Sequence, residues 1–265
     1  MPHWDPGWRF ALCCATLCLA LALLLRRRPR LGAGLREVSV AMGLWAVWVL
    51  IGSVTHPHVQ GAEARGRWLF RAEHRLRLPS EVTLVRHVAD HPWLAHVVDS
   101  YYVYGHLNVI VVLLAWTWWR HRPAYPALRA ELVLLSLAGL ALQLLTVAPP
   151  RLLPDLGFVD VANSYGESVY GQYADGLSGQ LMAMPSLHVG WAALVAWTVW
   201  RQAPPRWRWL GPAHLALMTI VVVASANHWW LDAIVAVLLL CLVVVAVERF
   251  PRRVPLRVPV AVASA

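Results

Sequence analysis

Lysine is absent from this 265-residue sequence, so its 23 positively charged side chains are all arginines. Charged residues make up only 14% of the chain, whereas hydrophobic residues make up 59% and the mean hydropathy is +0.53. A soluble domain of ordinary composition has roughly 25% charged residues. This shortage of charge argues against a soluble globular protein and predicts an integral membrane protein.

Cysteine is scarce as well, and its placement excludes two common uses. Cys13, Cys14 and Cys18 lie in the first apolar run, and Cys241 lies in the last. Their spacing resembles neither a disulfide framework nor a zinc motif. We therefore expect these thiols to behave as small apolar side chains within the bilayer.

The arginines give a formal net charge of +9, which can indicate nucleic-acid binding. Here they cluster at the ends of apolar runs, as topology signals and contacts with lipid headgroups do. Many of the 16 tryptophans gather there too, as in the aromatic belt of a membrane protein. No nucleic-acid-binding module is visible. The expected partners are the lipid bilayer and a membrane lipid phosphoester, not nucleic acid; the oligomeric state is left open.

Seven apolar runs divide the chain, at residues 8–25, 38–54, 101–119, 131–148, 187–200, 211–225 and 229–247. Several are shorter than the roughly 20 residues that span a bilayer, so we expect preceding loop residues to extend these helices. The first run could be a signal peptide, but arginines follow it rather than precede it, and no cleavage site is visible. We predict an all-α, polytopic membrane helical bundle of about six core transmembrane helices plus one extra N-terminal helix.

The runs suggest four regions: two N-terminal helices (1–55), an amphipathic interfacial segment (56–99), a catalytic transmembrane core (100–250) and a basic cytoplasmic tail (251–265). The interfacial segment contains several histidines, and the spacing of His87 and His91 would suit a metal on one helix face. Pro92 and the lack of a matching carboxylate pattern favour an ordinary solvated surface. A polar loop at 149–184 is long enough to suggest a functional role.

The distribution of arginine predicts the orientation of the bundle. If the segment after the first run is cytoplasmic, fifteen arginines fall on that side and eight on the other, six of them in the long interfacial segment. The positive-inside rule then places the N-terminus outside and the C-terminus inside. Arg151, His188 and His228 all fall on the extracytoplasmic side.

Two clusters of polar residues stand where long apolar runs begin. Such residues are costly in a bilayer unless they face a wet cavity or one another, which makes them functional candidates. His228 and Asp232 share a helix face, so the carboxylate can hold one imidazole nitrogen and leave the other nucleophilic; a polar pair that bridges helices is the alternative. Pro185-Ser186-Leu187-His188 resembles a helix start, where free amides suit a phosphoryl group and His188 can act as a general acid; Ser186 can equally be a simple cap.

Two further side chains are expected near these clusters. Arg151, in Ala148-Pro149-Pro150-Arg151, can bind phosphate oxygens through its guanidinium or be a plain interfacial arginine. His106 can line the pocket or cap the aromatic belt. Candidate catalytic residues are thus His228, Asp232 and His188. Candidate substrate-binding residues are Arg151, Ser186, Leu187, His106 and Asn227.

The ordered set Ala-Pro-Pro-Arg, Met-Pro-Ser-Leu-His and His-x-x-x-Asp resembles the type 2 phosphatidic acid phosphatase superfamily, over about residues 101–247. Within it the chain is most similar to the branch that contains the inositol phosphorylceramide synthases and their actinobacterial relatives. The resemblance implies phosphoryl transfer without a metal or cofactor: His228 attacks phosphorus, Asp232 orients it, and His188 protonates the leaving group. Arg151 and the amides near Ser186 would hold the phosphate.

Two departures from the superfamily pattern refine this expectation. The phosphatases often carry a lysine well before the first-motif arginine, where this chain has Leu144, and a Ser-Arg pair before the third-motif histidine, where it has Val221 and Val222. The synthase-like branch commonly lacks these residues. Fewer cations suit a phosphodiester, which carries less charge than a monoester.

Three alternatives remain. A lipid phosphate phosphatase acting on phosphatidic acid or a polyprenyl phosphate would use the same residues with water as acceptor. A proton-coupled transporter would be expected to show inverted repeats, and no convincing self-similarity is visible. A metalloenzyme could use His188, His228 and Asp232 as ligands.

Overall fold

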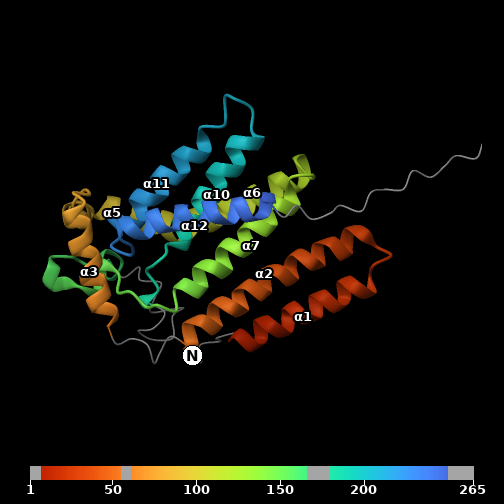
Figure 1. Cartoon of the computed structure of the whole chain (residues 1–265), viewed down its shortest axis with the longest axis horizontal. Helices are drawn as coiled ribbons and strands as arrows, with labels where there is room; N and C mark the ends of the chain where they lie inside the picture. Colours follow the sequence, from red (N-terminus) through yellow and green to blue (C-terminus); the bar gives the residue numbers. More distant parts are fainter. Residues whose placement is uncertain (1–6, 55–60, 166–179, 250–265) are drawn as a thin grey trace, which may run out of the picture.

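The computed structural model describes residues 7–54, 61–165 and 180–249 (Figure 1). Within them, regular structure is helical apart from an isolated bridge between Val147 and Met182. The long helices are α1 (Trp8–Leu24), α2 (Pro29–Val54), α6 (His106–Arg120), α7 (Tyr125–Leu142), α10 (Leu187–Gln202), α11 (Leu210–Ala224) and α12 (Trp230–Arg249). The short ones are α3 (Ala62–Arg75), α4 (Glu81–Ala89), α5 (Pro92–Ser100), the π-helix η2 (Tyr101–Gly105), the 3-10 turns η3 (Pro150–Leu152) and η4 (Pro154–Leu156), and α8 (Val161–Ser164).

The predicted polytopic helical bundle is confirmed, and all seven apolar runs form helices. Among the described residues, four helical stretches are long and apolar enough to cross a membrane: Pro29–Ser53, Pro92–Arg120, Tyr125–Leu142 and Trp230–Arg249. α1 and α11 are apolar but shorter. The predicted tail at 251–265 and the middle of the long loop, 166–179, lie outside the described residues.

Three helix boundaries differ from expectation. The third span begins at Pro92 rather than at residue 101, because α5, η2 and α6 are continuous and proline is well suited to a first helical position. α10 begins at Leu187, where its apolar run begins, so loop residues do not extend it. α7 ends at Leu142, before the end of its apolar run, and the chain beyond it turns toward other segments: the amide of Ala148 donates to the carbonyl of Ala62.

α10 lies at the centre of the bundle, in contact with α6, α7, α11 and α12. Small residues along it, such as Ala192 and Ala193, permit this close packing. A Cβ placed on Gly190 would lie 3.5 Å from Leu135 of α7 and 3.8 Å from Ala236 of α12. This packing fixes the first turn of α10 relative to α12, which matters for the site below.

α1 and α2 form a hairpin at the edge of the bundle (Figure 1). α2 joins the bundle through α7, where Glu37 accepts hydrogen bonds from Tyr125 at 2.8 Å and Arg129 at 2.6 Å. The hairpin contributes no residue to the candidate site.

The segment after α2 forms α3, α4 and α5, of which α3 contacts α12, and α4 and α5 contact α11. α3 is amphipathic, and Trp68 on its outer face is exposed. Its inner face packs on protein, because Gly66 lets the backbone of α3 approach Ala148: a Cβ there would lie 2.8 Å from the Ala148 carbonyl oxygen. α3 therefore also forms one wall around the site, and its place at the membrane surface stays a prediction.

Candidate active site

His228 lies in a short loop between α11 and α12 that is held from several directions. Ala226 takes a positive φ of 58°, which lets the loop reverse, and the His228 amide donates to the Val222 carbonyl at 3.1 Å. Trp229 anchors the loop: it is fully buried, and its indole donates to the Ala148 carbonyl at 3.0 Å. The backbone that carries His228 is thereby fixed.

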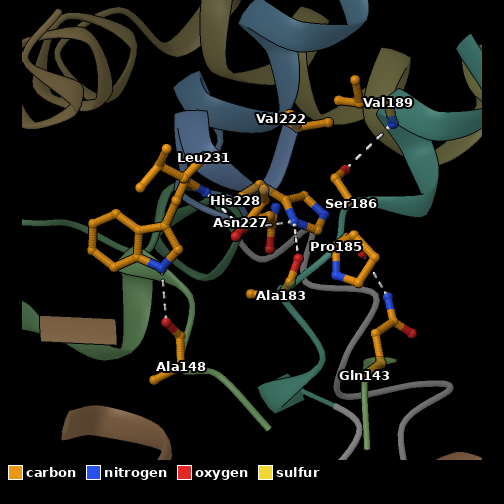
Figure 2. Close-up of polar contacts among 12 residues, drawn as sticks. Gln143, Ala148, Ala183, Pro185, Ser186, Val189, Val222, Asn227, His228 and Leu231 are labelled. Atoms are coloured by element: carbon orange, nitrogen blue, oxygen red, sulfur yellow. Dashed lines mark hydrogen bonds and ion pairs between the residues drawn. The ribbon is translucent and has the colours of Figure 1, made fainter. Parts of the chain in front are cut away.

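Nδ1 of the His228 imidazole faces two oxygen atoms. This nitrogen lies 2.8 Å from the Ala183 carbonyl oxygen and 3.3 Å from Oδ2 of Asp232, as Figure 2 shows for the Ala183 contact. Both partners are acceptors, so Nδ1 carries the proton and the lone pair resides on Nε2. Asp232 Oδ2 also accepts from the Trp229 amide at 2.9 Å, which orients the carboxylate.

His188 lies in the first turn of α10 and reaches the same place. Its ring is 5.9 Å from that of His228, centroid to centroid. Tyr102 of η2 stacks on it at 4.3 Å, and His106 lies 4.6 Å away. His106 in turn stacks on Trp191 at 5.0 Å. His106 thus belongs to the histidine cluster rather than to an aromatic belt.

Ser186 and Leu187 occupy the start of α10 in ways that limit their direct roles. The Ser186 hydroxyl accepts from the Val189 amide at 3.4 Å, and its own amide donates to the Asp232 carbonyl at 3.3 Å. Ser186 is therefore a buried helix cap that ties α10 to α12. The Leu187 side chain packs on Gly139, where a Cβ would lie 2.5 Å from its Cδ2. At Ser186 and Leu187, the backbone amides rather than the side chains are therefore suited to bind an anion.

Arg151, in η3, lies beside the His228 loop. Its amide donates to the Ala226 carbonyl at 3.0 Å, and its Nε donates to Oδ1 of Asn227 at 3.0 Å. One terminal nitrogen donates to Gln180 at 2.9 Å and lies 3.6 Å from Asp160. The guanidinium is buried, so it is an oriented cation rather than a plain interfacial arginine. Asn227 orients this guanidinium, and the side-chain Nδ2 of Asn227 in turn donates to the Ser225 hydroxyl.

Several contributors to this geometry escaped the sequence reasoning. Ala183 acts through its carbonyl, which no residue type reveals. Tyr102 stands in an aromatic-rich stretch, and that pattern alone does not single it out. Gln143 donates to the Pro185 carbonyl at 2.9 Å and supports the start of α10. A glutamine within an apolar run could have been recognised in the sequence as a candidate for such a buried contact.

The metal hypotheses find no geometric support in the part of the chain that the structure describes. No group of three or more histidine, cysteine, aspartate or glutamate side chains there is arranged to hold a metal ion. His87 on α4 and His91, the residue before α5, are both exposed; their rings lie 4.7 Å apart, and Nδ1 of His91 contacts the His87 carbonyl. His56 and His58 lie outside the described residues.

Comparison with known proteins places this site in a family. Residues 67–246 match the sequence model of the PAP2 superfamily, and this stretch contains all the candidate site residues. No curated protein and no solved structure matches the chain. Because the family match extends over more than half of the sequence, the chain is a membrane protein that belongs to the PAP2 superfamily.

Proposed function

We propose that this protein transfers a phosphorus-containing group from a membrane lipid phosphoester through a phosphohistidine on His228. Membership of the PAP2 superfamily supports a lipid phosphatase or phosphotransferase in general. The observation that carries the specific proposal is the contact of Nδ1 of His228 with two acceptors, Ala183 and Asp232, which leaves the Nε2 lone pair for attack.

In the first step, Nε2 attacks phosphorus and the bond from phosphorus to the leaving alcohol oxygen breaks. His188, as imidazolium, gives its proton to that oxygen. The guanidinium of Arg151 and the amides at the start of α10 stabilise the charge that develops on the phosphoryl oxygens. Asp232 stabilises the positive charge on the His228 ring.

In the second step, a hydroxyl oxygen attacks the phosphorus and the nitrogen–phosphorus bond breaks. Neutral His188 now accepts the proton of the attacking hydroxyl, which restores the starting state. Water as acceptor gives hydrolysis, and a lipid hydroxyl gives transfer; the protein groups required are the same.

A diester donor with a phosphoinositol-like headgroup suits this site better than a monoester. The two positions where many superfamily phosphatases place cations are Leu144 and Val221–Val222, and both valines are buried. Arg151 is the cation held against the His228 loop. A monoester with two negative charges would need more positively charged groups around it than a diester with one.

The active site is proposed to face away from the cytoplasm. Arg151, His188 and His228 lie together at one end of the bundle, whereas Arg129, Arg201 and their acidic partners lie at the other. The positive-inside rule assigns the second end to the cytoplasm.

The test is turnover by purified protein in detergent, with EDTA, of radiolabelled phosphatidic acid and phosphatidylinositol, each with and without a long-chain alcohol or ceramide acceptor. We expect acceptor-dependent transfer from the diester and an acid-labile, base-stable labelled enzyme. Faster hydrolysis of the monoester, unaffected by acceptor, would favour the phosphatase alternative. Turnover without any phosphoenzyme would overturn the covalent mechanism.

A further inference from the structure

Glu73 is a buried carboxyl group that the mechanism above does not use. It lies on α3, yet its Oε1 accepts a hydrogen bond of 2.7 Å from the amide of Leu231, in the first turn of α12. That amide has no acceptor within its own helix, so Glu73 caps α12 from another segment. The next residue along α12 is Asp232, the partner of His228.

A second buried carboxyl group faces Glu73. Glu81, the first residue of α4, is 1% exposed, as is Glu73, and their carboxyl groups lie within hydrogen-bonding reach of each other. Oε2 of Glu73 and Oε1 of Glu81 have no donor among the described residues. Two carboxylates cannot donate hydrogen bonds to each other, but a proton held between the two groups lets one donate to the other.

The surrounding charges favour that shared proton. Burial, followed by the hydrogen bond with Glu81, raises the pKa of Glu73 to about 9. The negative charges that act on Glu73 come from Glu81 on α4 and Asp232 on α12. At neutral pH Glu73 is therefore protonated and neutral beside the site.

We propose that Glu73 is a positioning residue of the active site. Through a proton shared with Glu81 it holds the first turn of α12, and with it Asp232 and His228, without adding negative charge near the phosphate. This inference rests on the proposed phosphoryl transfer and adds to it a residue of α3, far from the catalytic motifs in sequence.

Three variants test it in detergent-solubilised full-length protein. Glu73→Gln keeps the acceptor for Leu231 and supplies a permanent donor to Glu81, so it imitates the protonated pair. Glu73→Ala removes both contacts. Glu131→Gln is the matched control, because Glu131 is also a buried glutamate but lies near Arg201 and Glu248 at the other end of the bundle.

The first measurement is the unfolding temperature between pH 5 and 9, which needs no substrate. The folded protein keeps a proton on Glu73 that the unfolded chain releases above about pH 4.5, so Glu73 makes the folded state less stable as pH rises through this range. We expect Glu73→Gln to gain stability over the wild type progressively with pH. A flat difference overturns the shared proton.

The second measurement is phosphatidylinositol turnover. We expect Glu73→Gln to stay within about threefold of the wild-type kcat/KM at pH 7 and to exceed it at least threefold at pH 10, where the wild type has gained a charge beside Asp232. Glu73→Ala should lose at least tenfold in kcat, and Glu131→Gln should follow the wild type at every pH. Wild-type kcat in Glu73→Ala, or an equal loss in Glu73→Gln, overturns the positioning role.

The two measurements separate the two proposals. A wild-type protein that turns over no lipid phosphoester and forms no phosphoenzyme overturns the proposed function, whereas the unfolding series still supports or overturns the carboxyl pair.

Discussion

The two ends of the helical bundle use charge in opposite ways. At one end, Arg201 and Glu248 form an ion pair of 2.5 Å whose side chains are 47% and 50% exposed. At the other end, Arg151 and Asp232 are buried and hydrogen-bonded to segments distant in sequence or to the adjoining loop. Exposed pairs contribute about 0–1 kcal/mol, whereas buried polar groups cost energy unless their partners are fixed.

This difference indicates what each end is for. Arginines stacked over tryptophans, such as Arg122 over Trp118 and Arg208 over Trp200, suit a membrane interface, where position rather than precise geometry matters. The buried hydrogen-bond network around His228 fixes the distances between His228 and its partners and selects the tautomer of its imidazole. We therefore expect substitutions at the first end to change stability slightly and substitutions at the second to change chemistry.

The largest effect is expected for His228→Asn. Without the nucleophile no covalent intermediate forms, so turnover should fall by about 10⁴-fold or more, and the labelled phosphoenzyme should vanish. The measurement is phosphatidylinositol turnover and acid-labile labelling of purified protein. Arg201→Ala, at the other end, should retain both; labelled His228→Asn would show that another residue is the nucleophile.

The next effect is expected for Arg151→Lys. Lysine keeps the charge but loses the planar, forked donors, so kcat/KM should fall by about 10²-fold. Arg129→Lys is the matched control, because Arg129 pairs with Glu37 at the arginine-rich end. Steady-state kinetics of the two variants decide the point, and equal, small losses in both would remove Arg151 from the site.

A pair of glycine substitutions separates packing from chemistry. A Cβ on Gly66 would lie 2.8 Å from the Ala148 carbonyl oxygen, the acceptor of Trp229, and a Cβ on Gly211 would lie 2.8 Å from Cα of Ala196. Both variants should lose about 1–3 kcal/mol of stability through overpacking. Only Gly66→Ala should also lose activity per folded molecule, by about tenfold, as unfolding curves and kcat will show. Equal kcat in both would mean that α3 does not position the loop.

The smallest effect is expected for the exposed ion pair. A double-mutant cycle with Arg201→Ala and Glu248→Ala should give a coupling free energy below about 1 kcal/mol, with wild-type kcat throughout. Thermal unfolding in detergent at low and high salt provides the measurement. A coupling well above that value would mean that the two ends do not differ as described.

The motifs singled out residues that lie together in the structure, because their signals are local. The spacing of His228 and Asp232 places them on one side of the turn that begins α12, and Ser186 marks the start of α10 as a capping residue does. That His188 lies beside them was inferred from resemblance and membrane topology, and the structure brings the rings together. Their chemical roles stay predictions.

The supporting contacts were not predictable, for physical reasons. Ala183 contributes a backbone carbonyl, which every residue has. Glu73 and Trp229 act through hydrogen bonds to segments distant in the sequence. The hydrophobicity pattern places Glu73 in an amphipathic segment but does not indicate its buried partners. The early start of the third span at Pro92 was missed because α5 is less apolar than α6 and reads as interfacial on composition alone.

The hydrogen bond between Glu73 and Leu231 joins residues 158 positions apart and has a consequence for biosynthesis. The ribosome must complete α12 before the nucleophile, its carboxylate and their cap can meet. A nascent or truncated chain that lacks this last helix still contains Arg151, His188 and His228, but it lacks Asp232 and the Leu231 amide that Glu73 caps. Under the proposed mechanism, such an unfinished copy has no carboxylate to orient His228 and to stabilise the charge on its ring.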